Sequence, residues 1–327
     1  MTRTSRRTVL TGLTGLAAAG AFARPAWAQG QSQRPIKVIV PYAAGGASDI
    51  VARLVAVPMG QILGQSLYVD NRGGGASQIG TQAIATSAPD GTTVGVVDSA
   101  FTVNPGLFGA KLPYDTRRDF TPISLLARTS LVLVVPASLP VSSVKELVAL
   151  GKAKPGSLTM ATAGMGTAVH LGCEQFRQEA GLEVVSVPYR GGGPAIMDLI
   201  AGKVDFNFST IPAVLEQIRT GKLKALGVTT GRVALLPDVP SMAEAGLPSV
   251  DAAPDFGLVG PANLPPDILA RLAAAAAAAV QDPATRRRME EIGYEPIGST
   301  PQAYAAHIET MMAKWKHIID LGNIKPE

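Results

Sequence analysis

The sequence predicts an α/β protein of two lobes, each with a mixed, largely parallel sheet flanked by helices. Short apolar runs alternate with longer segments of helical periodicity, a pattern typical of α/β folds with parallel strands. The chain has 327 residues, which is more than one hydrophobic core usually serves. Its single cysteine, Cys173, rules out a disulfide within the chain, so the fold must depend on packing.

The elements are expected to alternate from the start of the first strand, 36–40, which ends at Pro41 and leads through a glycine-rich loop into a helix from Ser48. Further strands are expected at 66–70, 93–97, 131–135, 157–161, 184–187, 204–208 and 225–228, with helices at 142–154, 167–180, 194–201 and 211–220. Three successive helices then follow, at 265–280, 283–292 and 301–321, and these are expected to pack on the first lobe.

Two segments are expected to connect the lobes. Residues 248–260 are rich in Pro, Gly and Asp, which suits a chain that crosses back from the second lobe to the first. The other crossing is expected near 127–130. The prediction is therefore a discontinuous first domain, 29–130 plus 253–327, and a second domain, 131–252.

The first 28 residues have the features of an export signal. Arg6-Arg7 followed by Val9-Leu10 form a twin-arginine pattern, and Ala26-Trp27-Ala28 offers the small residues of a cleavage site. The apolar run at 13–22 is too short, and too rich in Gly and Ala, to span a bilayer of about 30 Å. We expect residues 1–28 to be removed and the chain from Gln29 to act in the periplasm.

The charge of the remaining chain excludes several kinds of partner. The whole sequence has 29 basic and 25 acidic residues, and removal of the four arginines in residues 1–28 leaves 25 of each. No basic surface is therefore expected that would bind nucleic acid or an anionic membrane.

Two glycine-rich loops are candidates for binding an anion. They lie at 43–49 and 162–167, and each follows a predicted strand and opens a helix. The N-terminus of a helix offers unpaired N–H groups and the positive end of the helix dipole, which suits a carboxylate or phosphate. Each loop alone could be a tight turn with a capping hydroxyl. Two such loops in two lobes favour one shared site beyond the carboxyl ends of the strands.

Enzymatic and cofactor-dependent functions find less support. The Gly-Met-Gly run at 164–166 lacks the third glycine of a dinucleotide fingerprint, because that position is Val169. His170, Cys173 and Glu174 share a helical face, but imidazoles are few and there is no second cysteine, so a packed cysteine explains them. No Gly-x-Ser-x-Gly nucleophile motif is present. We expect no metal, no cofactor and no enzymatic activity.

Several short motifs together resemble the periplasmic receptors of tripartite tricarboxylate transporters, often called Bug-type receptors. The motifs are, in chain order, 41–49 (PYAAGGASD), 52–53 (AR), 69–72 (VDNR), 88–91 (APDG), 104–105 (NP), 114–115 (YD), 119–120 (DF), 154–156 (KPG), 163–167 (AGMGT), 170–171 (HL), 187–191 (VPYRG), 202–205 (GKVD), 236–240 (LPDVP) and 243–246 (AEAG). Their order and spacing cover essentially the whole chain after residue 28.

This resemblance implies a flytrap fold, in which a small organic acid binds between the lobes and the loaded monomer is received by a membrane permease. It implies that both glycine loops hold the ligand carboxylate, partly through water, with side contacts from 99–101 and from the strand after Asp205. The expected ligand-binding residues are Tyr42, Ala44, Gly45, Gly46, Ala47, Ser48, Asp49, Ser99, Ala100, Phe101, Thr162, Ala163, Gly164, Met165, Gly166, Thr167, His170, Asp205 and Ser209.

The chain departs from the family pattern at Asp255, where relatives often have an aromatic residue before Phe-Gly. If Asp255 faces the cleft, it would repel a second carboxylate of the ligand or pair with a cationic group. The ligand stays open among dicarboxylates, tricarboxylates, acidic amino acids and aromatic acids. Two alternatives also stay open: a receptor that signals to a membrane kinase, and a secreted enzyme acting on a carboxylated substrate.

Overall fold

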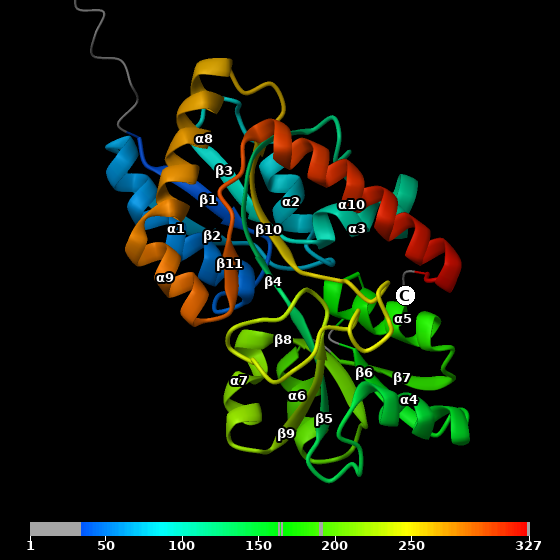
Figure 1. The fold of residues 1–327 in the computed structure, drawn as a ribbon. Coiled ribbons are helices and arrows are strands. Elements are labelled where there is room, and N and C mark those ends of the chain that lie inside the picture. The colour runs from blue at the N-terminus through cyan, green and yellow to red at the C-terminus, as the bar shows by residue number, and fades with distance from the viewer. Residues whose placement is uncertain (1–33, 163, 165, 190–191, 326–327) are drawn as a thin grey trace, which may run out of the picture. The chain divides into compact units, whose positions relative to one another are not determined.

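Both predicted sheets are present in a computed structural model of the chain (Figure 1). It describes residues 34–325 except 163, 165, 190 and 191, so the predicted export signal lies outside the described residues. The first sheet has six strands in the order β2-β1-β3-β10-β4-β11, and the second has five in the order β9-β5-β8-β6-β7. The two-lobed α/β fold class is confirmed.

The strands of the first sheet are β1 (Ile36–Val40), β2 (Leu67–Asn71), β3 (Thr93–Val97), β4 (Phe120–Thr129), β10 (Asp255–Pro261) and β11 (Tyr294–Pro296). Those of the second sheet are β5 (Leu131–Pro136), β6 (Leu158–Thr162), β7 (Val184–Pro188), β8 (Phe206–Thr210) and β9 (Leu223–Val228).

The helices are α1 (Ala47–Leu63), α2 (Gln78–Ala85), α3 (Ala100–Phe108), α4 (Val144–Ala153), α5 (Ala168–Ala180), α6 (Gly192–Ile200), α7 (Ile211–Arg219), α8 (Pro266–Gln281), α9 (Pro283–Glu291) and α10 (Pro301–Gly322), with a short 3-10 helix at Gly109–Lys111. In the described part of the chain, no helix is both long enough and apolar enough to cross a membrane.

The two sheets share one arrangement around a central strand. β1 pairs in parallel with β2 and β3, and β6 pairs in parallel with β7 and β8. The other pairs are antiparallel, so the sheets are more evenly mixed than the sequence pattern predicts. The reason is that β4 leads into β5 across one residue, without a crossover helix, and that β10 returns between β3 and β4. Each glycine loop therefore follows a strand, β1 or β6, that has a parallel strand on both sides.

Helices cover both faces of the first sheet (Figure 1). Residues of α1 and α8 pack in one apolar core against β1, β3, β4 and β10. On the other face, residues of α2, α3 and α10 pack in a separate core. Because α1 and α2 lie on opposite faces, the chain changes sides between β1 and β3. This is the position at which open α/β sheets form a crevice at the carboxyl ends of their strands.

The second sheet is buried in the same way. In β5 the residues Leu131, Leu133 and Val135 pack on the face covered by α4 and α5, while Val132 and Val134 pack on the face covered by α6 and α7. All five are fully buried. A strand with both faces covered reads as a continuous apolar run rather than an alternating one, which is why this strand could be predicted from the sequence.

The last helix, α10, packs on both lobes rather than on the first alone. It contacts α3 and β4 in the first lobe and α5 in the second. Trp315 of α10 is fully buried in a core that also holds Phe176 of α5 and Phe208 of β8. Helix α10 thus packs on the first lobe, as expected, and its apolar face in addition packs on the second lobe.

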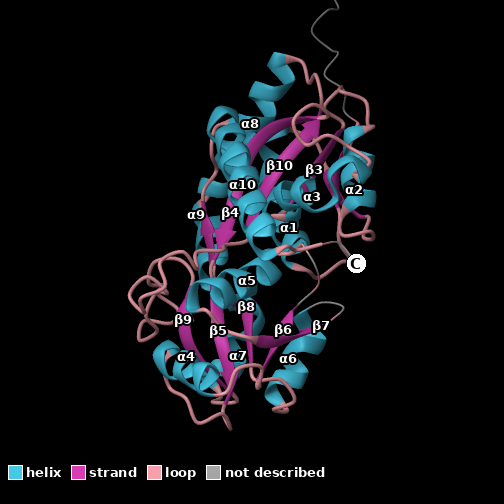
Figure 2. Ribbon diagram, turned by 90° about the vertical axis from the view of Figure 1, so that its right-hand side faces the viewer, coloured by secondary structure: helices cyan, strands magenta, loops and turns pink. Residues whose placement is uncertain are grey.

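The sheets are connected at two places, which Figure 2 shows from the side. Ser130 alone separates β4 from β5, and residues 229–254 lead from β9 back to β10. The hydroxyls of Ser130 and Thr230 are hydrogen bonded to each other, so the two connections touch. The expected crossing at 248–260 is too long, because β10 begins at Asp255 and lies inside the first sheet. The domain boundaries stay a prediction.

Candidate functional site

The first glycine loop is exposed, and the buried side chain of Asp49 holds it in place. Residues 43–46 are exposed, whereas Asp49 is buried. Its carboxylate accepts hydrogen bonds from the Gly45 N–H at 2.8 Å, Arg53 Nε at 2.9 Å and Asn71 Nδ2 at 3.0 Å. Burial raises the pKa of the Asp49 carboxyl, but the hydrogen bonds from Arg53, Gly45 and Asn71 outweigh burial and bring the pKa below its ordinary value. Asp49 is therefore ionised when it holds the loop in this conformation.

The helix that follows this loop begins without a side-chain cap in the described part of the chain. Gly46 is the N-cap, with extended backbone, and its carbonyl accepts the first helical hydrogen bond from the Ile50 N–H. The amides of 47–49 have no acceptor among the described residues. A helix start of this kind leaves N–H groups available to an anion.

The second glycine loop is folded by its own polar side chains. Thr167 Oγ accepts from the His170 N–H at 3.2 Å and donates to the Gly164 carbonyl at 2.9 Å. His170 Nδ1 accepts from the Gly166 N–H at 3.4 Å. The amides of Gly45 and Gly166 are thus bonded within the protein, and they are not free for a ligand in this structure. Ala163 and Met165, also predicted as contacts, lie outside the described residues.

Both loops contact the segment from Asp98 through α3. A Cβ added to Gly166 would lie 2.9 Å from Leu107 Cδ1 and 3.5 Å from Asn104 Oδ1. Directly before the first loop, the Tyr42 hydroxyl donates to Asp98 Oδ1 at 2.8 Å. Elements at the carboxyl ends of both sheets therefore meet around α3. Gly164 is more open, since only the Tyr189 carbonyl, at 3.9 Å, lies within 4 Å of an added Cβ.

The predicted contacts at 99–101 are largely committed to the fold. Ser99 Oγ accepts from the Asp255 N–H at 3.0 Å, and the Ala100 N–H donates to Asp98 Oδ1 at 3.0 Å. Phe101 is 1% exposed and packs edge to face against Phe120, with ring centroids 4.9 Å apart. The side chain of Phe101 therefore belongs to the core, and its contact with a ligand stays a prediction.

The two predicted residues of β8 lie at opposite ends of the strand. Ser209 is buried near the carboxyl end and donates to Asn207 Oδ1 at 3.0 Å. Asp205 precedes the strand, and its carboxylate accepts from both the N–H and the hydroxyl of Thr159 at 2.7 Å. Since β6 and β8 are parallel, this puts Asp205 at the edge of the sheet opposite to Thr162. The structure does not bring Asp205 to the site.

The helical face of His170, Cys173 and Glu174 is part of the protein core. The thiol of Cys173 is fully buried, 3.7 Å from the Ala161 carbonyl oxygen, and burial raises its pKa to about 12. Glu174 pairs with Arg177. A buried thiol in its protonated form is a poor nucleophile and a poor metal ligand.

Sequence reasoning missed Asp98, which lies in the middle of the lobe-one contacts. It hydrogen bonds to Tyr42 and to the Ala100 amide, two of the predicted contacts. Burial raises the pKa of Asp98 to about 6, although both hydrogen bonds act to lower it. The signal was present in the sequence, because Asp98 is the first residue after the predicted strand 93–97 and so stands at its carboxyl end.

The direction of Asp255, left open by the sequence, is decided by two partners. Its carboxylate accepts from Arg128 Nε at 2.8 Å and lies 2.7 Å from His307 Nε2. Asp255 is 8% exposed and begins β10. Its charge is therefore committed to a cluster that ties β4 to α10, and it offers no free carboxylate to a ligand.

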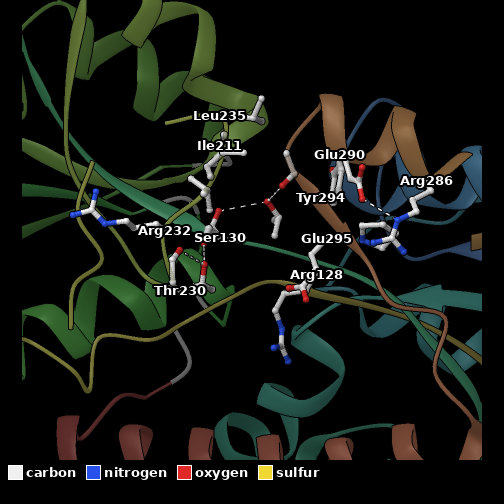
Figure 3. A pocket seen from close by; sticks show the side chains of 16 residues that line it. Arg128, Ser130, Ile211, Thr230, Arg232, Leu235, Arg286, Glu290, Tyr294 and Glu295 are labelled. Carbon is white, nitrogen blue, oxygen red and sulfur yellow. Dashed lines mark hydrogen bonds and ion pairs between the residues drawn. The ribbon is translucent and has the colours of Figure 1, made fainter. Parts of the chain in front are cut away.

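A cavity of about 460 Å³ lies beside Ser130 and Thr230, where the two connections between the sheets touch (Figure 3). It is bounded by Ser130 and Thr230, by the loop up to Leu235, and by residues of α9 and β11. Its arginines pair with acids: Arg128 with Asp255, Arg232 with Glu244, and Arg286 with Glu290. None of the predicted ligand-binding residues lines this cavity.

Replacing Asp49 by alanine is expected to lower the free energy of unfolding by about 1–3 kcal/mol at pH 7, since Gly45 and Asn71 lose their acceptor. The pKa of Asp49 is lowered by folding, so its stabilisation is present above the ordinary value of 3.8 and is lost as the pH falls through the lower folded value. Urea unfolding of both proteins at pH 7 and pH 3 measures this. A difference in stability that does not shrink at pH 3 would contradict the assignment.

Comparison with known proteins identifies the family. The model of the tripartite tricarboxylate transporter family receptor matches residues 51–324. The protein BugT of Bordetella pertussis is 35% identical over 306 residues, which cover 93% of this chain and 94% of BugT.

Solved structures agree with this match. The periplasmic binding protein BugD is 30% identical, with a TM-score of 0.81 over 90% of this chain and all of BugD. An R. palustris protein solved with adipate is 32% identical, with a TM-score of 0.82 over 90% of this chain and 99% of its own. MatC from Rhodopseudomonas palustris, solved with bound malate, is 29% identical, with a TM-score of 0.77 over 88% of this chain and 99% of its own. The chain therefore belongs to the tripartite tricarboxylate transporter receptor family, the Bug-type periplasmic solute-binding proteins.

Proposed function

We propose that this receptor captures a small carboxylate-bearing organic acid between its lobes in the periplasm and passes it to the permease of a tripartite tricarboxylate transporter. The observation that carries the proposal is the start of α1, where the amides of 47–49 have no acceptor among the described residues. Such amides can donate to a ligand carboxylate. The adipate and malate bound to two relatives are both dicarboxylates, which supports an acid as ligand.

The proposed anion site consists of the first loop and of the second, in which Gly164 and Thr167 are half-buried. In the first loop it uses Ala44, Gly46, the amides of 47–49 and the Ser48 hydroxyl. In the second it uses Gly164 and the loop up to Thr167, with His170 and Ser209 behind them. The Asp49 side chain positions the first loop, while its amide belongs to the proposed site. Charge-assisted hydrogen bonds of about 1.5–3 kcal/mol each would supply most of the recognition.

Closure of the lobes would couple binding to delivery. The proposed domains meet at Ser130 and at the return segment before β10, and the ligand favours the closed form because only there do both loops reach the same carboxylate. A predicted twin-arginine signal would bring the folded receptor to the periplasm. The permease would then read the closed state.

A thermal-shift screen against organic acids tests this function. A ligand present at about 100 times its dissociation constant is expected to stabilise the protein by about 2.7 kcal/mol. Neutral amides of the same acids serve as matched controls and should not stabilise it. Failure of every mono-, di- and tricarboxylate to raise the unfolding temperature would contradict the proposal.

The same ligand distinguishes a receptor from an enzyme. After prolonged incubation with the protein, a receptor releases the acid unchanged, which mass spectrometry of the recovered ligand would establish. A product that accumulates with time would instead support the alternative of a secreted enzyme.

A further inference from the structure

Asp98 stands where an α/β sheet forms its ligand crevice. β1 and β3 pair in parallel with Ile39 opposite Gly95, and continuing this register places Asp98 opposite Tyr42 at the carboxyl ends of the two strands. The chain changes faces between these strands, since α1 and α2 lie on opposite sides of the sheet. A side chain at this point faces the crevice outside the strand ends.

The carboxyl of Asp98 has hydrogen-bond donors but no cation. The Tyr42 hydroxyl and the Ala100 N–H both reach Oδ1, at 2.8 and 3.0 Å. Oδ2 receives no donor from another described residue, and no Lys, Arg or His in the described ranges pairs with Asp98. The buried or partly buried carboxylates of Asp49, Glu174 and Asp255 differ in this respect, because each has an arginine partner.

Three tyrosines lie near Asp98. The Tyr42 hydroxyl donates to Asp98, and burial, together with the charge of Asp98, raises the pKa of the Tyr42, Tyr114 and Tyr304 phenols. Asp98 is half-buried, and in the register of β1 and β3 it lies level with Tyr42, directly before the first loop. The pair of sites, amides at the start of α1 and a carboxylate at the end of β3, offers one place for an anion and one for a hydrogen-bond donor.

We propose that Asp98 determines ligand specificity, by accepting an ammonium or hydroxyl group of the bound acid and by disfavouring a second carboxylate at that position. This inference rests on the proposed function of an organic-acid receptor. An ammonium group binds more strongly than a hydroxyl, since a charge-assisted hydrogen bond is about twice as strong as a neutral one. The ligand class is therefore an amino acid or, next to it, a hydroxy acid.

Calorimetry with two matched series tests the proposal. Succinate, malate and aspartate have the same two carboxylates with hydrogen, hydroxyl or ammonium on the neighbouring carbon. Adipate and 6-aminohexanoate differ only in the group at the far end of the chain. In at least one series, the receptor is expected to bind the acid with an ammonium or hydroxyl group about tenfold more tightly than the acid without it. This difference corresponds to one charge-assisted hydrogen bond.

The variant Asp98→Asn should remove this preference. Asparagine keeps the shape of the side chain and a carbonyl oxygen for Tyr42 and Ala100, while it loses the charge. Asp320→Asn, which removes an exposed carboxylate paired with Lys316 at the end of α10, is the matched control and should retain the preference.

The dependence on pH gives a second measurement. Because the pKa of Asp98 is raised to about 6, a carboxylate bound beside it will favour its protonated form. Adipate affinity should then rise several-fold from pH 8 to pH 6 in the unaltered protein and less in Asp98→Asn, whose amide cannot take up the proton.

The outcomes are distinct. Suppose that acids of the panel bind, but that Asp98→Asn leaves the preference within each series and the pH dependence of adipate binding unchanged. The role of Asp98 is then overturned, while the receptor function stands. If the unaltered protein binds no acid in either this panel or the wider screen, the receptor function itself fails.

Discussion

Replacing Gly46 by leucine is expected to weaken ligand binding by about 100-fold or more while the protein stays folded. Gly46 is the exposed N-cap of α1, and its φ of −76° is open to any residue. An added Cβ would have only the Ala43 carbonyl within 4 Å, at 3.6 Å. The fold therefore tolerates the side chain, but leucine would fill the space beside the amides of 47–49. Loss of two charge-assisted hydrogen bonds, about 1.5–3 kcal/mol each, accounts for the expected effect.

The measurement is calorimetry with the tightest acid from the thermal-shift screen, with urea unfolding alongside to verify the fold. Gly231→Leu is the matched control, because Gly231 is also exposed and no atom lies within 4 Å of an added Cβ. Equal affinity in Gly46→Leu and the unaltered protein would remove the start of α1 from the binding site.

Replacing Gly257 by alanine is expected to lower the free energy of unfolding by about 3 kcal/mol or more. Gly257 lies in β10, and an added Cβ would be 1.9 Å from Tyr304 Oη and 2.1 Å from Tyr304 Cζ. Tyr304 is 4% exposed and is held in α10, so its ring cannot move aside without displacing the helix. Overpacking of a dense core costs about 1–3 kcal/mol, and more where the neighbour is rigid.

Urea unfolding of Gly257→Ala tests this, with Gly231→Ala as the matched control at an open position. Combining Gly257→Ala with Tyr304→Ala removes the ring that causes the clash. The double variant should then be more stable than the sum of the two single changes predicts. A single variant within about 0.5 kcal/mol of the unaltered protein would show that α10 does not rest on the backbone of β10.

The same glycine explains why the sequence predicts a connecting segment where the structure has β10. Its sequence, DFGLVGP, has an acid, two glycines and a terminal proline, which lower the local preference for a strand. In the fold, Gly257 and Gly260 give room to Tyr304 and Leu264. Where another element packs closely on a strand, glycine is thus favoured at the contact, although glycine has a low local propensity to form strands.

The candidate site residues also differ in whether the sequence alone predicts their role. The glycine loops could be predicted because a turn that opens a helix is a local pattern, and Asp98 could have been added by the same rule. The commitment of Phe101 to the core and of Asp205 to Thr159 could not be predicted, since each depends on a partner at least 19 residues away in the chain.

The amino-acid sequence by itself determined the α/β class, the main strands and helices, the two glycine loops and the family. The elements and loops follow from periodicity and turn residues, which act over a few neighbouring residues, and the family follows from the order of short motifs along the chain. Only the tertiary structure decided that β10 completes the first sheet, that α10 packs on both lobes, that Arg128 and His307 hold Asp255, and that Asp98 has no cationic partner in the described chain. These features arise from contacts between distant segments, whose burial and charge are set when the chain has folded.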